Sequence, residues 1–110
     1  MQFTYESCFV MKVYDADTIT VRVDQGFSNS TVKTLRLARI NAWEVRGVER
    51  PAGLIARDWL RTLILGKVVR VTTRKDKTGK YGRYIAEVFF DGGNVNDQIV
   101  ALGHGKYQSY

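Results

Sequence analysis

Three short segments carry polar side chains that a strand or a turn does not require. They are residues 15–18 (Asp-Ala-Asp-Thr), 36–44 (Arg-Leu-Ala-Arg-Ile-Asn-Ala-Trp-Glu) and 80–83 (Lys-Tyr-Gly-Arg). Carboxylates can bind a hard cation or take up a proton, and arginines can bind phosphate oxygens through paired hydrogen bonds. Taken singly, each segment is a weak signal, because Asp and Gly are common in turns and Arg is common on surfaces. The chain has one cysteine and one histidine, so any bound metal would be held mostly by oxygen.

The charge of the chain is unevenly distributed. The 17 basic and 11 acidic residues give a formal net charge of +6. Residues 50–90 hold ten basic side chains against three acidic ones, a local balance of +7, whereas residues 1–49 hold six of each. Such a one-sided basic field attracts polyanions, and a nucleic-acid backbone is the partner it favours. A solvated surface that binds nothing is the alternative on charge alone.

Apolar periodicity predicts five strands and two helices that must position these segments. The strands are expected at residues 8–15, 18–24, 31–40, 67–73 and 84–90. A first helix is expected from Pro51 to Gly66, and a second at residues 94–102 with Asn94 as its N-cap and Gly103 at its end. The remaining segments are expected to be a tight turn at 15–17, a loop at 41–50, a basic loop at 74–83 and a frayed tail at 104–110.

The expected order of elements matches a small five-stranded barrel of the oligonucleotide-binding (OB) type with two helices, which is a mainly β, α+β fold. We expect a single domain over residues 1–110 with its core in residues 8–103. No apolar run approaches the roughly 20 residues of a membrane span, and residues 1–9 lack a signal-peptide pattern. We therefore expect an unprocessed cytoplasmic monomer that does not bind membranes.

The three segments, taken together and in this order, resemble the motifs of the staphylococcal nuclease (thermonuclease) family. That pattern runs Asp-Gly-Asp-Thr, then Arg followed by Asp-Thr-Pro-Glu, then Lys-Tyr-Gly-Arg, and the resemblance covers roughly residues 10–106. Residues 95–97 (Val-Asn-Asp) also resemble the Val-Asn-Glu that opens a helix in the family. The resemblance implies a five-stranded OB barrel with packed helices that cleaves DNA and RNA and uses calcium (Ca2+).

The resemblance also implies three catalytic residues. Arg36 and Arg83 correspond to residues that clamp the reacting phosphate, and Glu44 corresponds to the base that deprotonates the attacking water, or at least orients it. The residue types suit these roles, because arginine makes two-pronged contacts with phosphate and stays protonated. Hydrolysis needs a base, and His104 stands alone in the predicted tail, so a carboxylate has to serve.

The metal ligands implied by the resemblance differ from the family pattern at one position. Asp17 corresponds to a direct carboxylate ligand, Ala42 to a residue that lends its backbone carbonyl, and Asp15 to an acid that acts through water. Asn41 stands where the family has an aspartate ligand, so the site should bind calcium more weakly. For Asp15 and Asp17 the alternative is an Asx-type turn with no metal role.

Further candidates would bind substrate beyond the reacting phosphate. Lys80 and Tyr81 resemble family residues that hold the terminal phosphate of a bound nucleotide, and Tyr107 and Tyr110 could supply aromatics near its base. Trp43 replaces a proline of the family and either stacks on a base or caps the barrel. The basic loop adds Arg74, Lys75 and Lys77.

These observations together predict a calcium-dependent endonuclease. It would hydrolyse phosphodiester bonds of single-stranded or locally melted DNA and RNA with little sequence preference, and the resemblance implies 3′-phosphate products. A catalytically weak or silent nucleic-acid-binding OB module is the main alternative, and Asn41 is the residue that supports it. A barrel that binds protein ligands through its cleft is a second alternative, which leaves the basic loop without a role.

Overall fold

The computed structural model describes residues 2–78 and 83–109, and it describes side chains outside residues 74–82. The two main helices are α1 (Arg50–Ile64) and α2 (Val95–Ala101), and a 3-10 turn, η1 (Gly47–Glu49), precedes α1. The strands are β1 (Gln2–Asp15), β2 (Thr18–Gly26), β3 (Asn29–Leu37), β4 (Ile40–Ala42), β5 (Val68–Thr78), β6 (Tyr84–Phe90), β7 (Gly93–Asn94) and β8 (Gly105–Tyr107).

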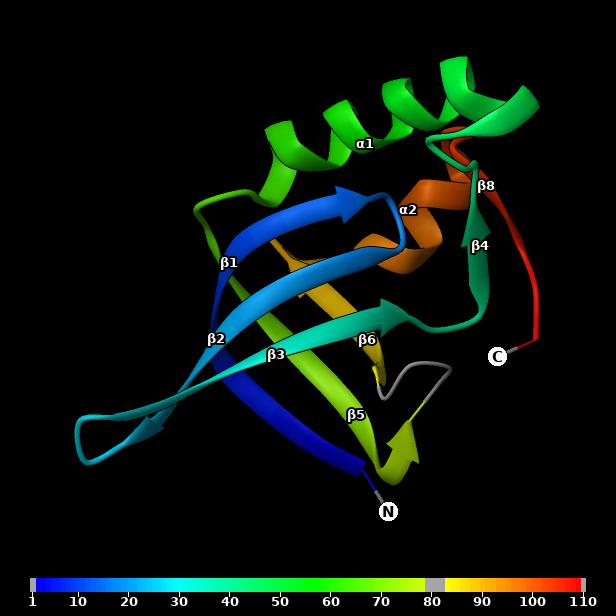
Figure 1. Cartoon of the computed structure of the whole chain (residues 1–110). Helices are drawn as coiled ribbons and strands as arrows, with labels where there is room; N and C mark the ends of the chain where they lie inside the picture. Colours follow the sequence, from blue (N-terminus) through cyan, green and yellow to red (C-terminus); the bar gives the residue numbers. More distant parts are fainter. Residues whose placement is uncertain (1, 79–82, 110) are drawn as a thin grey trace.

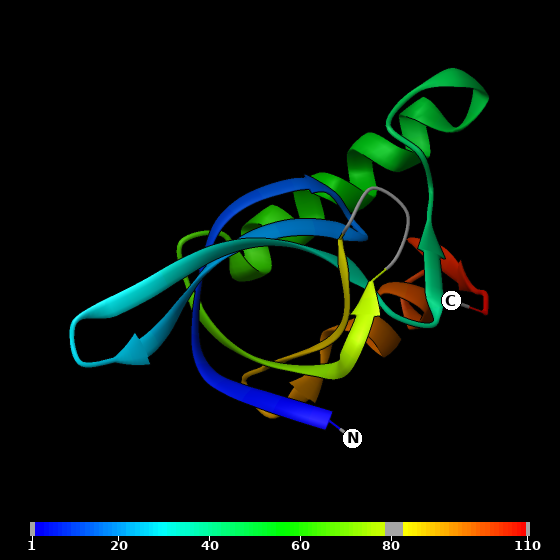
Figure 2. The ribbon, with the colours of Figure 1, turned by 60° about the horizontal axis from the view of Figure 1, so that its bottom comes forward.

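Five strands close into a barrel. They follow the order β3-β2-β1-β5-β6 with antiparallel neighbours, and β6 completes the ring by pairing in parallel with β3. Figure 1 shows α1 across one end of the barrel, and Figure 2 shows the ring of strands from another direction. The predicted mainly β fold of OB type with two helices is therefore confirmed.

The core lies inside this ring and under α1. Ile19, Val21 and Val23 alternate with outward residues along β2, and all three are buried, as their spacing predicts. The apolar stripe of α1 buries Ala56 and Leu60. The boundary signals are also confirmed, because Pro51 lies in the first turn of α1 and the left-handed Gly66 follows its end.

Several element boundaries differ from the sequence expectation. The first strand begins at Gln2 and contains two register shifts against β2, so its residues do not show a simple alternation. The predicted third strand ends at Leu37, and the chain turns through Arg39, which has a φ of 66°, before β4. The expected basic loop begins instead as a continuation of β5 to Thr78, where Arg74 pairs with Gln2 of β1 and Thr78 with Tyr84 of β6.

The sequence does not predict three short strands, and one of them is β7, which pairs with β6. Residues 40–42, placed at the end of a strand and in a loop, form β4, and residues 105–107, placed in a frayed tail, form β8. The two strands pair with each other in antiparallel register, Asn41 opposite Lys106. Each is only three residues long and has no periodic pattern, so its partner is what defines it.

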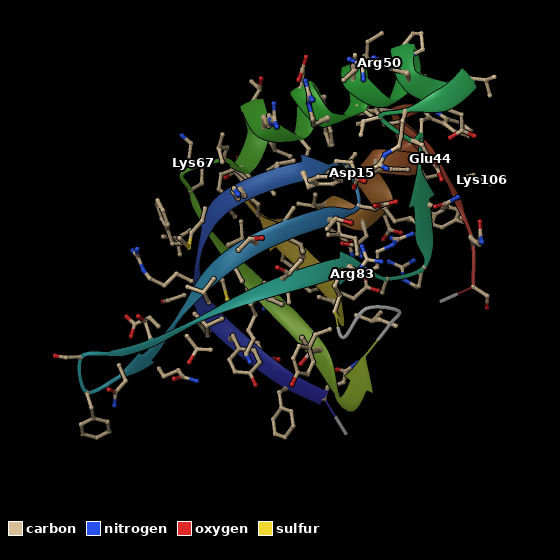
Figure 3. The ribbon with its side chains drawn as sticks, viewed as in Figure 1. Asp15, Glu44, Arg50, Lys67, Arg83 and Lys106 are labelled. Carbon is tan, nitrogen blue, oxygen red and sulfur yellow. The ribbon has the colours of Figure 1, made fainter. Side chains whose placement is uncertain are left out.

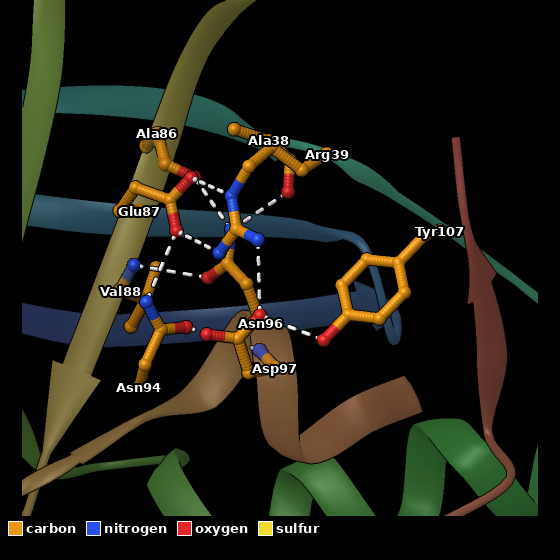
Figure 4. Close-up of polar contacts among 9 residues, drawn as sticks. All are labelled: Ala38, Arg39, Ala86, Glu87, Val88, Asn94, Asn96, Asp97 and Tyr107. Atoms are coloured by element: carbon orange, nitrogen blue, oxygen red, sulfur yellow. Dashed lines mark hydrogen bonds and ion pairs between the residues drawn. The ribbon is translucent and has the colours of Figure 1, made fainter. Parts of the chain in front are cut away.

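A polar network fastens α2 to the barrel and to the turn before β4 (Figure 4). The fully buried Asn96 accepts a hydrogen bond from the Val88 amide and donates to the carbonyls of Ala38 and Ala86, each at 3.0 Å. Arg39 donates to both carboxylate oxygens of Glu87, at 2.8 and 2.7 Å, and to Asp97 at 3.0 Å. Residues 38–39, which link β3 to β4, are therefore held from two sides.

Candidate active site

A cleft of about 400 Å³ gathers the predicted catalytic and metal-binding residues. It is formed by the β1–β2 turn, the ends of β3 and β4, the loop after β4 and Arg83, which directly precedes β6. Figure 3 shows Asp15, Glu44 and Arg83 on the same side of the molecule. The seven predicted residues that line the cleft are Asp15, Asp17, Arg36, Asn41, Ala42, Glu44 and Arg83. Residues that are far apart in the sequence thus face one space.

The β1–β2 turn places two carboxylates at the inner side of the cleft. Asp15 Oδ1 accepts a hydrogen bond of 3.0 Å from the Asp17 amide, so the Asx-type bond considered from the sequence is present. Burial, together with the neighbouring Asp17, raises the pKa of Asp15 to about 7. Ala16 is fully buried and does not have a positive φ, so alanine meets no backbone strain where the family has glycine.

Arg36 lies deep in the cleft and is held by several acceptors. Its residue is 6% exposed, and its Nη2 forms an ion pair of 3.3 Å with Asp17 Oδ2. Nη1 donates to the Leu37 carbonyl at 2.8 Å, and Nη2 also donates to Asn41 Oδ1 at 3.3 Å. Because these contacts come from β3, β4 and the β1–β2 turn, the guanidinium is fixed before any substrate binds.

Thr18 links the two arginines, although sequence reasoning did not name it as a site residue. Arg83 Nη1 donates to Thr18 Oγ1 at 3.2 Å, and Thr18 Oγ1 in turn donates to Asp17 Oδ1 at 3.2 Å. Asp17 therefore connects to Arg83 through Thr18 and to Arg36 directly. The signal available in the sequence was the fourth position of the Asp-Ala-Asp-Thr segment, and the strand register pairs this residue with Arg36 on β3.

The segment that carries Glu44 is held against the start of α1. The Glu44 amide donates to Glu49 Oε1 at 2.9 Å, and Arg50 Nη1 donates to the Val45 carbonyl at 3.0 Å. A Cβ atom on Gly53 would lie 1.9 Å from the Glu44 carbonyl oxygen, so only glycine allows this approach. The Glu44 side chain is exposed and lines the cleft with both arginines.

The cleft holds oxygen donors of the type that calcium accepts. Asp15 and Asp17 supply carboxylates, and Asn41 supplies an amide oxygen. The Ala42 amide donates to Asp17 Oδ2 at 2.9 Å, and in an extended strand the carbonyl of the same residue points to the same side. Within the described part of the chain no three His, Cys, Asp or Glu side chains gather to hold a metal, so this donor set has only two carboxylates.

Two predicted substrate-binding residues lie elsewhere among the described residues. Trp43 Nε1 donates to the Gly103 carbonyl at 2.8 Å, which fastens β4 to the end of α2, and Trp43 is not among the residues that line the cleft. The Tyr107 hydroxyl donates to Asp97 at 2.9 Å, and its ring lies 6.0 Å from Arg39. The His104 ring lies against the Trp59 ring in a tilted arrangement, with centroids 5.1 Å apart, and His104 is not among the residues that line the cleft.

The other predicted substrate-binding residues cannot be placed as side chains. Lys80, Tyr81 and Tyr110 lie outside the described residues. Arg74, Lys75 and Lys77 belong to β5, whose backbone is described there while the side chains are not.

Comparison with known proteins identifies the family. No individually curated protein sequence matches the chain. A sequence model described as staphylococcal nuclease homologue matches residues 34–110, a stretch that includes Arg36, Glu44 and Arg83. No helix in the described part of the chain is long and apolar enough to cross a membrane. Family membership supports a nuclease-like or nucleic-acid-binding role, and the chain belongs to the family of staphylococcal nuclease homologues.

Proposed function

We propose that the protein is a calcium-dependent endonuclease that hydrolyses phosphodiester bonds of single-stranded or locally melted DNA and RNA with little sequence preference. The observation that supports this most is the convergence of Arg36, Glu44 and Arg83 on one cleft beside two carboxylates. A module that only binds the nucleic-acid backbone needs positive charge, but it has no use for an exposed glutamate in the same cleft.

In this proposal the two arginines hold the reacting phosphate. Arg36 is buried and fixed by Asp17 and Asn41, and Arg83 is positioned through Thr18, so both cations are oriented before substrate arrives. Hydrolysis passes through a five-coordinate phosphorus whose equatorial oxygens gain negative charge. Preorganised guanidinium groups stabilise that charge, and each donor contributes about 10²- to 10³-fold in rate.

Glu44 is proposed as the base that accepts a proton from the attacking water. The water oxygen bonds to phosphorus as the bond to the 5′ oxygen breaks, which leaves a 3′-phosphate and a 5′-hydroxyl. The leaving 5′ oxygen takes up a proton, so the overall reaction consumes one water. A positioned carboxylate that removes the water proton contributes about 10²- to 10⁴-fold.

Calcium is proposed to be held by Asp17, the Ala42 carbonyl and Asn41, with Asp15 acting through water. When bound, it would supply positive charge next to the phosphate and further orient the reacting groups. Asn41 keeps an oxygen donor but lacks the charge of the family aspartate, so the site is expected to fill fully only when a substrate phosphate completes it. Lys80 and Tyr81 remain proposed contacts for a neighbouring phosphate.

The test is cleavage of a labelled single-stranded DNA and RNA by the wild-type protein and by Glu44→Gln, in calcium and in EDTA. We expect calcium-dependent cleavage that falls by about 10²-fold or more in Glu44→Gln, while binding of the strand is retained. Binding without cleavage by the wild type would support the silent module, to which Asn41 points. Absence of both binding and cleavage would overturn a nucleic-acid role for the cleft.

A further inference from the structure

A second groove opens beside the candidate active site on the outer face of β1–β3. Its volume is about 560 Å³, and it shares Tyr14, Thr18 and Arg83 with the lining of the cleft. The two hollows are therefore adjoining parts of one depression, which continues from the cleft toward Arg61 and Leu65 at the end of α1. In the view of Figure 3, Asp15 and Arg83 mark the cleft end of these strands.

The register of the strands explains this continuity. The register of β1 against β2 shifts twice, between Val10 and Lys12 and between Val13 and Asp15. Because of these shifts, residues three positions apart on β1 lie opposite residues two positions apart on β2. Residues whose side chains face away from the barrel core therefore form successive cross-strand rows on β1, β2 and β3. The rows are Asp15, Thr18 and Arg36 in the cleft, then Lys12, Thr20 and Thr34, then Phe9, Arg22 and Val32.

The lining of the groove is positively charged, which favours binding of a phosphate backbone. Its basic lining residues are Lys12, Arg61 and Arg83, and its described lining includes no aspartate or glutamate. Arg61 reaches from α1 to β1, where its Nε donates to the Val13 carbonyl at 3.1 Å. The second row also carries hydroxyl groups, since Thr20 and Thr34 share a hydrogen bond of 3.2 Å on the exposed face.

Apolar and aromatic surface lies between these charges. Met11 and Leu65 in the groove are each 41% exposed, and Tyr14, at the junction with the cleft, is 55% exposed. The third row lies beyond this groove, in a separate hollow that also holds Asp24, and there the Arg22 guanidinium lies 4.9 Å from the centre of the Phe9 ring. Basic groups interleaved with aromatic faces are typical of surfaces that bind single-stranded nucleic acid through phosphates and stacked bases.

We propose that this groove is an extended subsite that binds the single strand continuing from the reacting phosphate, with Lys12 and Arg61 on the next phosphates and Arg22 with Phe9 further on. The inference rests on the proposed function for the position of the reacting phosphate. Rows two residues apart on β2 are separated by about 6.6 Å, which is close to the spacing of phosphates in an extended strand. Each cross-strand row can therefore contact about one nucleotide of the bound strand.

The experiment measures binding of fluorescent oligothymidylates of about two to about eight nucleotides by anisotropy in EDTA. We expect wild-type affinity to rise with length, and Lys12→Ala to weaken the longer strands about fivefold without affecting the dinucleotide. Arg22→Ala should weaken only the longest strands. Arg70→Ala is the matched control, because Arg70 is exposed on β5 and lies 4.5 Å from the Phe89 ring, in a pair like that of Arg22 and Phe9.

Salt dependence gives an independent readout. Loss of one phosphate contact should lower the slope of log Kd against log salt by about 0.7 in Lys12→Ala, with no change in Arg70→Ala. Equal effects of Lys12→Ala and Arg70→Ala, or affinity that does not rise beyond the dinucleotide, would overturn the subsite. Length-dependent binding that needs Lys12, in a protein that cleaves nothing in calcium, would support the subsite while refuting the nuclease.

Discussion

At the scale of single residues, the two arginines of the cleft differ in how much they contribute to the stability of the fold. Arg36 and Asp17 form a pair whose side chains are 7% and 10% exposed, whereas Arg83 is less buried and donates to the hydroxyl of Thr18. Removal of one partner from a buried pair leaves the other charge desolvated. Arg36 should therefore matter for folding as well as for catalysis, and Arg83 mainly for catalysis.

This difference predicts separable effects of two alanine variants. Arg36→Ala should lower the free energy of unfolding by about 3 kcal/mol and also reduce cleavage. Arg83→Ala should reduce kcat/KM by about 10²- to 10³-fold while changing stability by less than about 1 kcal/mol. Urea unfolding and single-strand cleavage measure the two quantities. Equal stability of the two variants would contradict the assignment of Arg36 to a buried ion pair.

Asn41 is expected to set the calcium requirement. Asn41→Asp adds a carboxylate beside Asp15 and Asp17 and should lower the calcium concentration for half-maximal cleavage roughly tenfold. Calcium titration of the wild type, with and without a nucleotide analogue, should show tight binding only when the nucleotide is present. Tight binding by the wild type alone would contradict the idea that substrate completes the site.

Asp15 gives a pH-dependent stability in the absence of metal. Its pKa rises from 3.8 to about 7 in the folded protein, because burial and Asp17 disfavour the charged form. The folded state therefore binds the proton more tightly, and stability is lost as pH rises from about 4 to about 7. Asp15→Asn removes this titration and keeps an oxygen that can accept the Asp17 amide.

The free energy of unfolding of Asp15→Asn should therefore rise relative to that of the wild type between pH 5 and pH 8. The expected rise is on the order of 1 kcal/mol after allowance for partial exposure. Urea midpoints of both proteins in EDTA across this range are the measurement. Parallel pH profiles would show that Asp15 is not perturbed.

At the scale of elements, the packing of α1 against the loop after β4 positions the proposed base. Gly53 is buried, and the Glu44 carbonyl occupies the place where a Cβ atom would lie. Gly53→Ala should displace this loop, lower stability by about 2 kcal/mol or more and reduce kcat. Ala52→Gly is a matched control at the neighbouring exposed position, and should cost about 1 kcal/mol without an effect specific to the cleft. Cleavage by both variants at equal folded concentration decides the question.

The sequence predicts the elements well where a pattern is local, and poorly where a partner defines them. Asn94 caps α2 through its bond with the Asp97 amide, and Gly103 follows the helix end with a positive φ, as predicted from residue type alone. The short strands β4 and β8 depend on each other, and the proximity of Gly53 to Glu44 exists only after α1 has docked. Such contacts between distant segments leave no periodic signal.

At the scale of the whole molecule, closure of the barrel is what assembles the cleft. The parallel pairing of β3 with β6 places Leu35 opposite Tyr84, and each of these residues is the neighbour of a cleft arginine. Arg36 and Arg83 are 47 positions apart in the chain, so no local pattern relates them. The ordered motifs shared with the nuclease family could indicate their convergence, whereas the linking role of Thr18 required the fold.

The central claim is that Arg83 and Glu44 act on the same phosphate in one cleft. A double-mutant cycle on kcat/KM for calcium-dependent cleavage of one single-stranded substrate tests it most directly, with Glu44→Gln, Arg83→Ala and the combined variant. We predict a large loss in each single variant and a combined loss well below the product of the two. Fully multiplicative losses, or a single variant with wild-type activity, would contradict the proposed joint action.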